Sequence, residues 1–217
     1  MAEHYCEMGT SALVRGEYDE ARRSFKESIR LRCKDASQGA ARFASIVTET
    51  KIQSKPMNIA ARLASSETIA AHNWFAMFDR AFVLSRLESH IAFVTACIYN
   101  IGLSYHLEAM LYAEESSYHF WKAKRFYETA LGALQKAGPE DLDGTFVVVQ
   151  LALFNNLAHV SCHLCEWNEI EIFYKTSTVL IPHLKYPESN LCHDDAVFFD
   201  HLRTGLGLEG LNKAAAA

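Results

Sequence analysis

Residues 5–12 read Tyr-Cys-Glu-Met-Gly-Thr-Ser-Ala, and residues 16–28 read Gly-Glu-Tyr-Asp-Glu-Ala-Arg-Arg-Ser-Phe-Lys-Glu-Ser. Within this stretch, small and aromatic residues follow one another at spacings of twelve, four and three: Gly9, Ala21, Phe25 and Ser28. Small side chains at these spacings let two antiparallel helices approach closely, and the aromatic ring fills the space beside them. The stretch therefore predicts a helical hairpin.

The same pattern occurs twice more in the chain. The second copy consists of Gly102, Ala123, Tyr127 and Ala130, with the first spacing lengthened to twenty-one. The third copy consists of Ala158, Ile170, Tyr174 and Ser177 and keeps all three spacings. Because each unit of a helical array buries its apolar face against its neighbours, this self-similarity predicts stacked hairpins.

The three copies resemble the tetratricopeptide repeat. The first helix of that family reads aromatic-x-x-Leu-Gly-x-x-aromatic, and the second helix reads Ala-x-x-x-Phe-x-x-Ala. The first unit here reads Tyr5-x-x-Met8-Gly9-x-x-Ala12, so Ala12 departs from the aromatic of the family. The resemblance implies an all-α fold, a tetratricopeptide-like helical-hairpin array that forms a short right-handed α-solenoid. It carries no enzymatic signature, and we expect that the chain is not an enzyme.

The array is irregular. Gly9 and Gly102 lie 93 residues apart, whereas regular repeats of this family follow one another at about 34 residues. We therefore expect one structural domain of five parts: a first repeat at 1–33, an irregular insertion at 34–88, a second repeat with an inserted turn at 89–137, a third repeat at 145–181 and a C-terminal capping helix at 190–207. Within the insertion we expect a short helix at 57–65 and an extended piece at 73–86 across the first hairpin.

Composition limits the classes of partner. The chain has 217 residues, a net charge of −5 and 50% hydrophobic residues, which argues against nucleic acid or an anionic membrane as the main partner. We find no signal peptide and no run of eighteen apolar residues. Six cysteines without a framework spacing are typical of reduced thiols. We expect a cytoplasmic protein whose partner is another protein, and self-association stays open.

The resemblance also implies where a ligand binds. In tetratricopeptide arrays the first helix of each unit lines the concave groove. Carried over to this sequence, the positions in the second and third units are Tyr99, Asn100, Leu103, His106, Asn155, Asn156, His159 and His163, and those in the first unit are Cys6, Thr10 and Leu13. Asn100 and Asn156 occupy equivalent places. A side-chain amide offers a donor and an acceptor, so the pair can grip a peptide backbone of any sequence.

Three alternatives stay open at this point. Each asparagine side chain can instead hydrogen-bond the backbone of a neighbouring turn. The insertion can fold into the groove and close it, which leaves the convex face or a self-association surface as the functional one. A small helical metal protein or enzyme can use His159 and His163, four residues apart, together with Cys162. No complementary pair of ligands appears elsewhere at matching spacing, and we expect no metal and no cofactor.

Other groupings favour a structural role. The aromatic sets around Trp121 and Trp167 have helical spacing, which is typical of core packing. The sequence thus predicts a non-catalytic interaction scaffold, an adaptor that binds a peptide or helix of another protein in the concave groove.

Overall fold

The computed structural model describes residues 1–37, 53–57, 77–83, 90–112, 116–136, 144–183, 197–199 and 202. These residues are mostly helical, and their elements in chain order are α1 (Ala2–Arg15), α2 (Tyr18–Ser37), β1 (Gln53–Pro56), β2 (Arg80–Val83), α4 (His90–Leu111), α5 (Ser116–Leu134), α6 (Gly144–His163), α7 (Trp167–Leu180) and a 3-10 turn, η5 (Ile181–His183). The predicted all-α class is confirmed.

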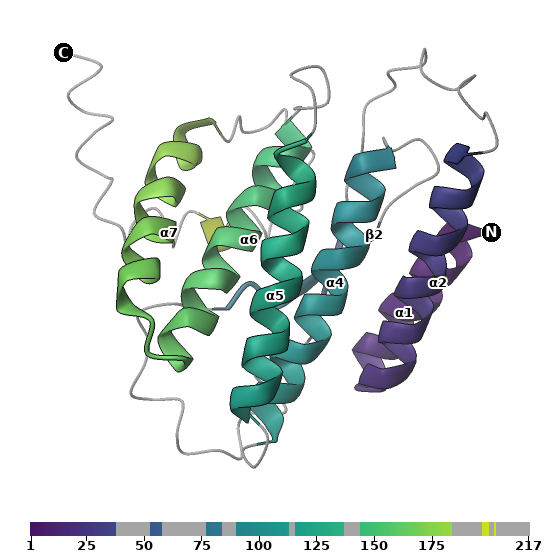
Figure 1. Cartoon of the computed structure of the whole chain (residues 1–217), viewed down its shortest axis with the longest axis horizontal. Helices are drawn as coiled ribbons and strands as arrows, with labels where there is room; N and C mark the ends of the chain where they lie inside the picture. Colours follow the sequence, from purple (N-terminus) through teal and green to yellow (C-terminus); the bar gives the residue numbers. More distant parts are fainter. Residues whose placement is uncertain are drawn as a thin grey trace.

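The helices pair in chain order. Helix α1 packs on α2, α4 on α5 and α6 on α7, and the pairs then meet through α2 against α4 and α5 against α6. Figure 1 shows the three hairpins side by side along the long axis of the molecule. The first hairpin extends beyond the predicted boundary at residue 33, because α2 continues to Ser37.

Glycine lets two of the hairpins close tightly. A Cβ atom placed on Gly9 would lie 2.8 Å from Cε1 of Phe25, and one on Gly102 would lie 2.8 Å from Cε1 of Tyr127. Both rings are fully buried. The third hairpin differs, because Tyr174 at the corresponding position is only half-buried.

Two of the hairpin turns use a left-handed residue after the first helix. Gly16 ends α1 with φ of 81°, and its N–H donates to the carbonyl of Leu13. Cys165 takes the same place after α6 with φ of 60°. Side chains with a Cβ rarely adopt this conformation, so the third turn is strained where the first is not.

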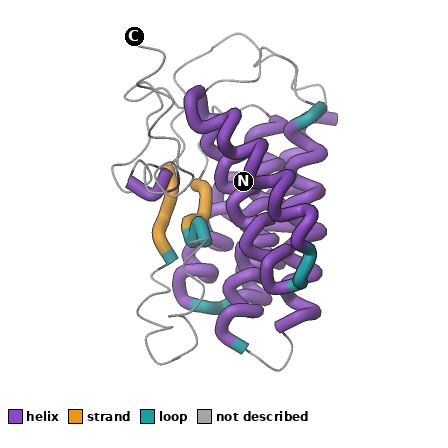
Figure 2. Tube along the Cα trace, turned by 90° about the vertical axis from the view of Figure 1, so that its left-hand side faces the viewer, coloured by secondary structure: helices purple, strands orange, loops and turns teal. Residues whose placement is uncertain are grey.

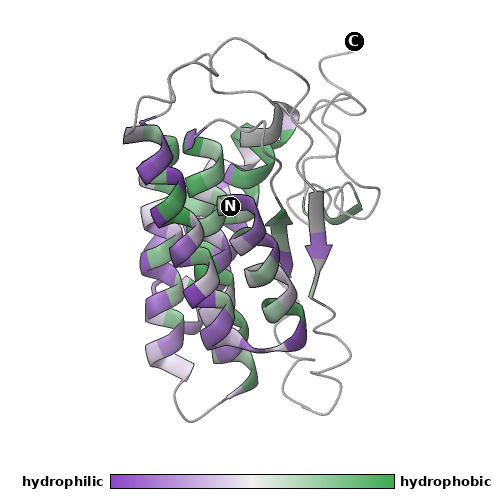
Figure 3. Ribbon diagram, turned by 90° about the vertical axis from the view of Figure 1, so that its right-hand side faces the viewer, coloured by the Kyte–Doolittle hydropathy of each residue, from purple (hydrophilic) through white to green (hydrophobic). Residues whose placement is uncertain are grey.

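The insertion contributes a two-stranded antiparallel sheet, in which Gln53 faces Val83 and Pro56 faces Arg80. The prediction of an irregular insertion at 34–88 is wrong at β1, whereas β2 confirms the extended piece expected within 73–86. Strand β2 packs against α4 and α1. Figure 2 shows both strands on one side of the helices, and Figure 3 shows the more hydrophobic strand nearer to them. The short helix expected at 57–65 lies outside the described residues, apart from Met57.

The predicted capping helix is described only at residues 197–199 and 202, which are helical. Phe199 is buried, and its ring stacks on Phe78 with 5.3 Å between centroids. The expectation that Trp121 and Trp167 pack in the core is wrong, since they are 50% and 66% exposed. They lie at the outward positions of the second helices. Among the described residues, no helix combines the length and the apolar character that a membrane crossing requires.

Candidate functional site

Asn100 grips the backbone of the chain's own β2. Its Oδ1 accepts the N–H of Phe82 at 2.9 Å, and its Nδ2 donates to the carbonyl of the same residue at 2.8 Å. Both groups of one peptide residue are thereby satisfied by one side chain. Asn100 and Phe82 are fully buried, so these bonds replace water where none is available.

Asn156 repeats the arrangement four residues earlier on the same segment. Its Oδ1 accepts the N–H of Phe78 at 2.9 Å, and its Nδ2 donates to the carbonyl of Phe78 at 3.1 Å. The hydroxyl of Tyr99 also donates to this carbonyl at 3.1 Å. The two amides therefore act as equivalent backbone clamps on α4 and α6, and the clamped segment runs across the first helices of both hairpins.

The side chains of the clamped residues fill the space between the helices. Phe78 and Phe82 are fully buried. The ring of Phe82 lies 4.8 Å from that of Tyr99, and the ring of Phe78 lies 5.8 Å from that of Phe82. The site thus combines side-chain pockets with backbone clamps, as strand-addition sites do.

A series of polar groups runs from the second clamp on α6 through the second hairpin and back to α6. Nδ2 of Asn156 lies 3.3 Å from the Tyr127 hydroxyl, which lies 3.2 Å from Nδ1 of His106. Nε2 of His106 lies 2.9 Å from Nδ1 of His159. Asn156 Nδ2 can only donate, so the oxygen of the Tyr127 hydroxyl accepts its hydrogen bond. The Tyr127 O–H is then left to donate to Nδ1 of His106. The Nε2–H of His106 then donates to His159.

The surroundings keep these imidazoles neutral. Burial, followed by the neighbouring imidazole of His163, lowers the pKa of His159 to about 3. Burial and the two other imidazoles lower the pKa of His106 well below its ordinary value. Burial likewise raises the pKa of the Tyr127 phenol, which the hydrogen bond from Asn156 opposes. These polar groups thus form a neutral hydrogen-bonding network that orients the side chain of Asn156.

The remaining predicted groove residues have structural surroundings. Leu103 is fully buried, and so are the first-unit positions Cys6, Thr10 and Leu13. Asn155 is buried beside Asn156, with its Nδ2 3.4 Å from the neighbouring Oδ1. His163 is exposed, and its ring stacks on Phe120 with 4.3 Å between centroids.

Both clamps lie at the asparagines that the sequence singled out. The partner of each is not a neighbouring turn but a segment of the insertion, 18 and 78 residues away, as expected from the alternative in which the insertion folds against the first helices. The sequence did not indicate the contact between His106 and His159. The fourfold spacing of Phe78 and Phe82 was a signal in the sequence, and it matches the two clamps.

The residues considered as metal ligands differ in their surroundings. Nδ1 of His159 is bonded to His106, while Cys162 is half-buried and His163 is exposed. Within the described ranges, no three His, Cys, Asp or Glu side chains are grouped so that they could hold a metal ion.

Compared with family models, with curated proteins and with solved structures, the chain matches none of them. The resemblance to the tetratricopeptide repeat therefore depends on the chain's own residues.

Proposed function

We propose that the three hairpins form a tetratricopeptide-like right-handed solenoid and that the protein is a non-catalytic interaction scaffold. Its inner groove receives an extended segment with two large apolar side chains four residues apart. The chain's own residues 77–83 support this proposal, because they lie against α1 and α4 and are bonded by Asn100 of α4 and Asn156 of α6. A partner protein supplies a segment of the same kind and displaces them.

The observation that carries the proposal is the pair of amide clamps. Asn100 and Asn156 each bond both the N–H and the C=O of one residue. These contacts recognise the backbone and do not depend on which side chain that residue carries. Side-chain selection comes from the pockets that hold Phe78 and Phe82. Such a division, with main-chain bonds giving affinity and alternate pockets giving specificity, is how extended peptides are recognised.

A partner segment has to compete with residues 77–83, which belong to the same chain as the binding site. A tethered segment competes at an effective concentration of the order of millimolar. A free peptide with a Kd in the micromolar range is consequently held back until the tethered segment is weakened. Weakening the native occupant is therefore the most direct way to reveal the receptor.

The test uses a blocked synthetic peptide with the sequence of residues 77–83, Met-Phe-Asp-Arg-Ala-Phe-Val. It is titrated against wild type and the Phe82→Ala variant by fluorescence anisotropy and thermal unfolding. We expect saturable binding to the variant, a rise in its midpoint from mass action, and at least about tenfold weaker binding to wild type.

A peptide of the same composition with its phenylalanines three residues apart is the matched control and should not bind. If Phe82→Ala does not fold, the test is the titration of wild type, for which weaker but saturable binding is expected. Failure of the native peptide to bind either protein, or equal binding of the respaced peptide, contradicts the proposed function.

A further inference from the structure

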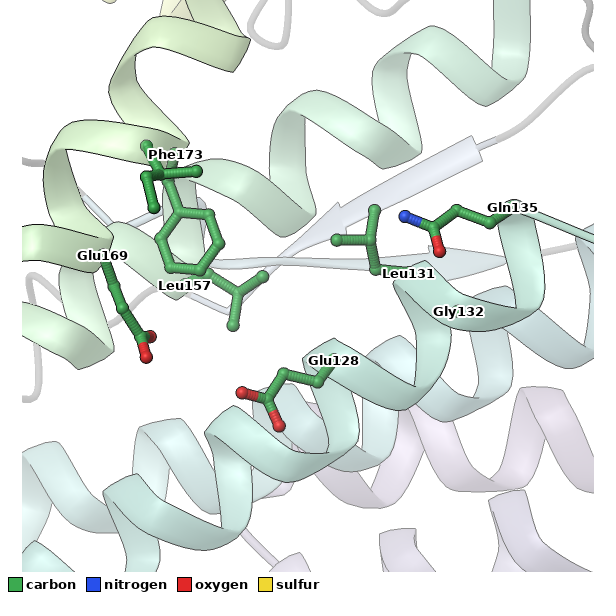
Figure 4. A pocket seen from close by; sticks show the side chains of 8 residues that line it. Glu128, Leu131, Gly132, Gln135, Leu157, Glu169 and Phe173 are labelled. Carbon is green, nitrogen blue, oxygen red and sulfur yellow. The ribbon is translucent and has the colours of Figure 1, made fainter.

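A cleft lies between the second helices α5 and α7, above Leu157 of α6. Its volume is about 330 Å³, and its lining comes from three helices and the turn after α5: Glu128, Leu131, Gly132, Gln135, Leu157, Glu169, Ile172 and Phe173. None of these residues belongs to the clamps on α4 and α6. Figure 4 shows Leu131, Leu157 and Phe173 around its middle, with the carboxylates of Glu128 and Glu169 along one border.

Gly132 lines this cleft, and no packed neighbour explains why a glycine is present at this helical position. Glycine destabilises a helix relative to alanine, and at Gly9 and Gly102 a packed aromatic ring explains why it is present. A Cβ on Gly132 would meet nothing within 4 Å. A missing side chain at an open cleft lets a ligand approach the helix closely.

The charges at the border favour a cation. The ammonium of Lys124 lies 2.6 Å from carboxylate oxygens of both Glu166 and Glu169 and 4.0 Å from an oxygen of Glu128. One ammonium shared among three carboxylates leaves negative charge in excess. Glu128, the most distant of the three, borders the cleft with its side chain 43% exposed.

The apolar floor extends onto the surface. Leu157 is fully buried at the base, whereas Ile172 at the rim is 60% exposed. A concavity lined mainly by apolar side chains, with a few polar groups at its border, is the usual form of a ligand site. The volume is at the lower end of the range for ligand sites, which suits one anchoring side chain.

We propose that the cleft between α5 and α7 is a second docking site, which takes a protein segment with a large apolar anchor flanked by lysine or arginine. The anchor fills the space over Gly132 and Leu157, and the flanking cation pairs with Glu128. This site is independent of the inner groove, so the scaffold can hold two segments on opposite faces.

The probe is the blocked peptide Gly-Lys-Phe-Lys-Gly, and its matched control is Gly-Glu-Phe-Glu-Gly. Both are titrated into the full chain while the methyl NMR signals of Leu131, Leu157 and Ile172 are followed. We expect saturable shifts with the basic peptide at high micromolar to millimolar concentration. The acidic peptide should give none.

Two variants locate the site. Gly132→Leu fills the cleft and should weaken binding at least about tenfold without lowering the thermal midpoint. Thr129→Leu adds the same side chain at an exposed position outside the cleft lining and should leave binding unchanged. Glu128→Gln should weaken binding and reduce its salt dependence. No saturable shift, equal binding of the acidic peptide, or unchanged binding by Gly132→Leu would each overturn the proposal.

Discussion

Replacing Asn100 by alanine removes both hydrogen bonds to Phe82 and leaves that residue's N–H and C=O buried without partners. The lost bonds are 2.9 and 2.8 Å long, and both residues are fully buried. Each buried backbone group left unsatisfied costs about 1–3 kcal/mol. For the two groups we therefore expect Asn100→Ala to lower the free energy of unfolding by about 2–6 kcal/mol, a large share of the stability of a typical domain.

Urea unfolding followed by circular dichroism measures this change through the transition midpoint. Asn168→Ala is the matched control, because Asn168 is exposed and its loss should change stability by less than about 0.5 kcal/mol. A loss below about 1 kcal/mol in Asn100→Ala would mean that the amide does not hold β2 in solution. That outcome would refute the reasoning behind both clamps.

Four further outcomes follow from the structure. Phe25→Ala empties a fully buried aromatic site and should cost about 3–5 kcal/mol in urea unfolding; a near-neutral result contradicts the repeat alignment. Because the pKa of His159 is lowered to about 3, the unfolded chain binds a proton below about pH 6.5 that the folded chain does not, so this group alone should lower the free energy of unfolding by about 2 kcal/mol at pH 5, and His106, whose pKa is also lowered, adds to the loss; unfolding curves that coincide at pH 7.5 and pH 5 would count against neutral imidazoles. Cys165→Gly relieves a φ of 60° and should stabilise the fold by roughly 1 kcal/mol, seen as a higher thermal midpoint; a lower midpoint shows that the turn is unstrained. Zinc titration monitored by calorimetry should give the same result for wild type and for His159→Ala/His163→Ala, and stoichiometric binding lost in the double variant would favour the metal-protein alternative.

The hairpins were predictable because their determinants are local. Gly9 and Phe25 lie within one hairpin and are placed by helical spacing, and the Phe25 ring packs 2.8 Å from where a Cβ of Gly9 would be. The equivalence of Asn100 and Asn156 was likewise readable, since it depends on the phase of each residue within its repeat.

Which residues of the insertion each asparagine would bond was not predictable from the same rules. Phe78 and Asn156 are 78 residues apart, and no helical period or turn signal connects them. The contact between His106 and His159 depends on how two hairpins stack, which spacing within either helix does not determine. Cys165 adopts its positive φ because the turn requires it, although the sequence offers no glycine there.

The central claim is that the inner face holds an extended backbone through two amides. Residue-resolved hydrogen exchange of the full chain at neutral pH tests it directly, because the amides of Phe78 and Phe82 have side-chain oxygens as their acceptors. The account predicts that both exchange as slowly as buried amides of α4, and that Asn100→Ala accelerates Phe82 more than Phe78. Exchange of both amides in wild type at the rate of an exposed, unstructured amide would contradict it.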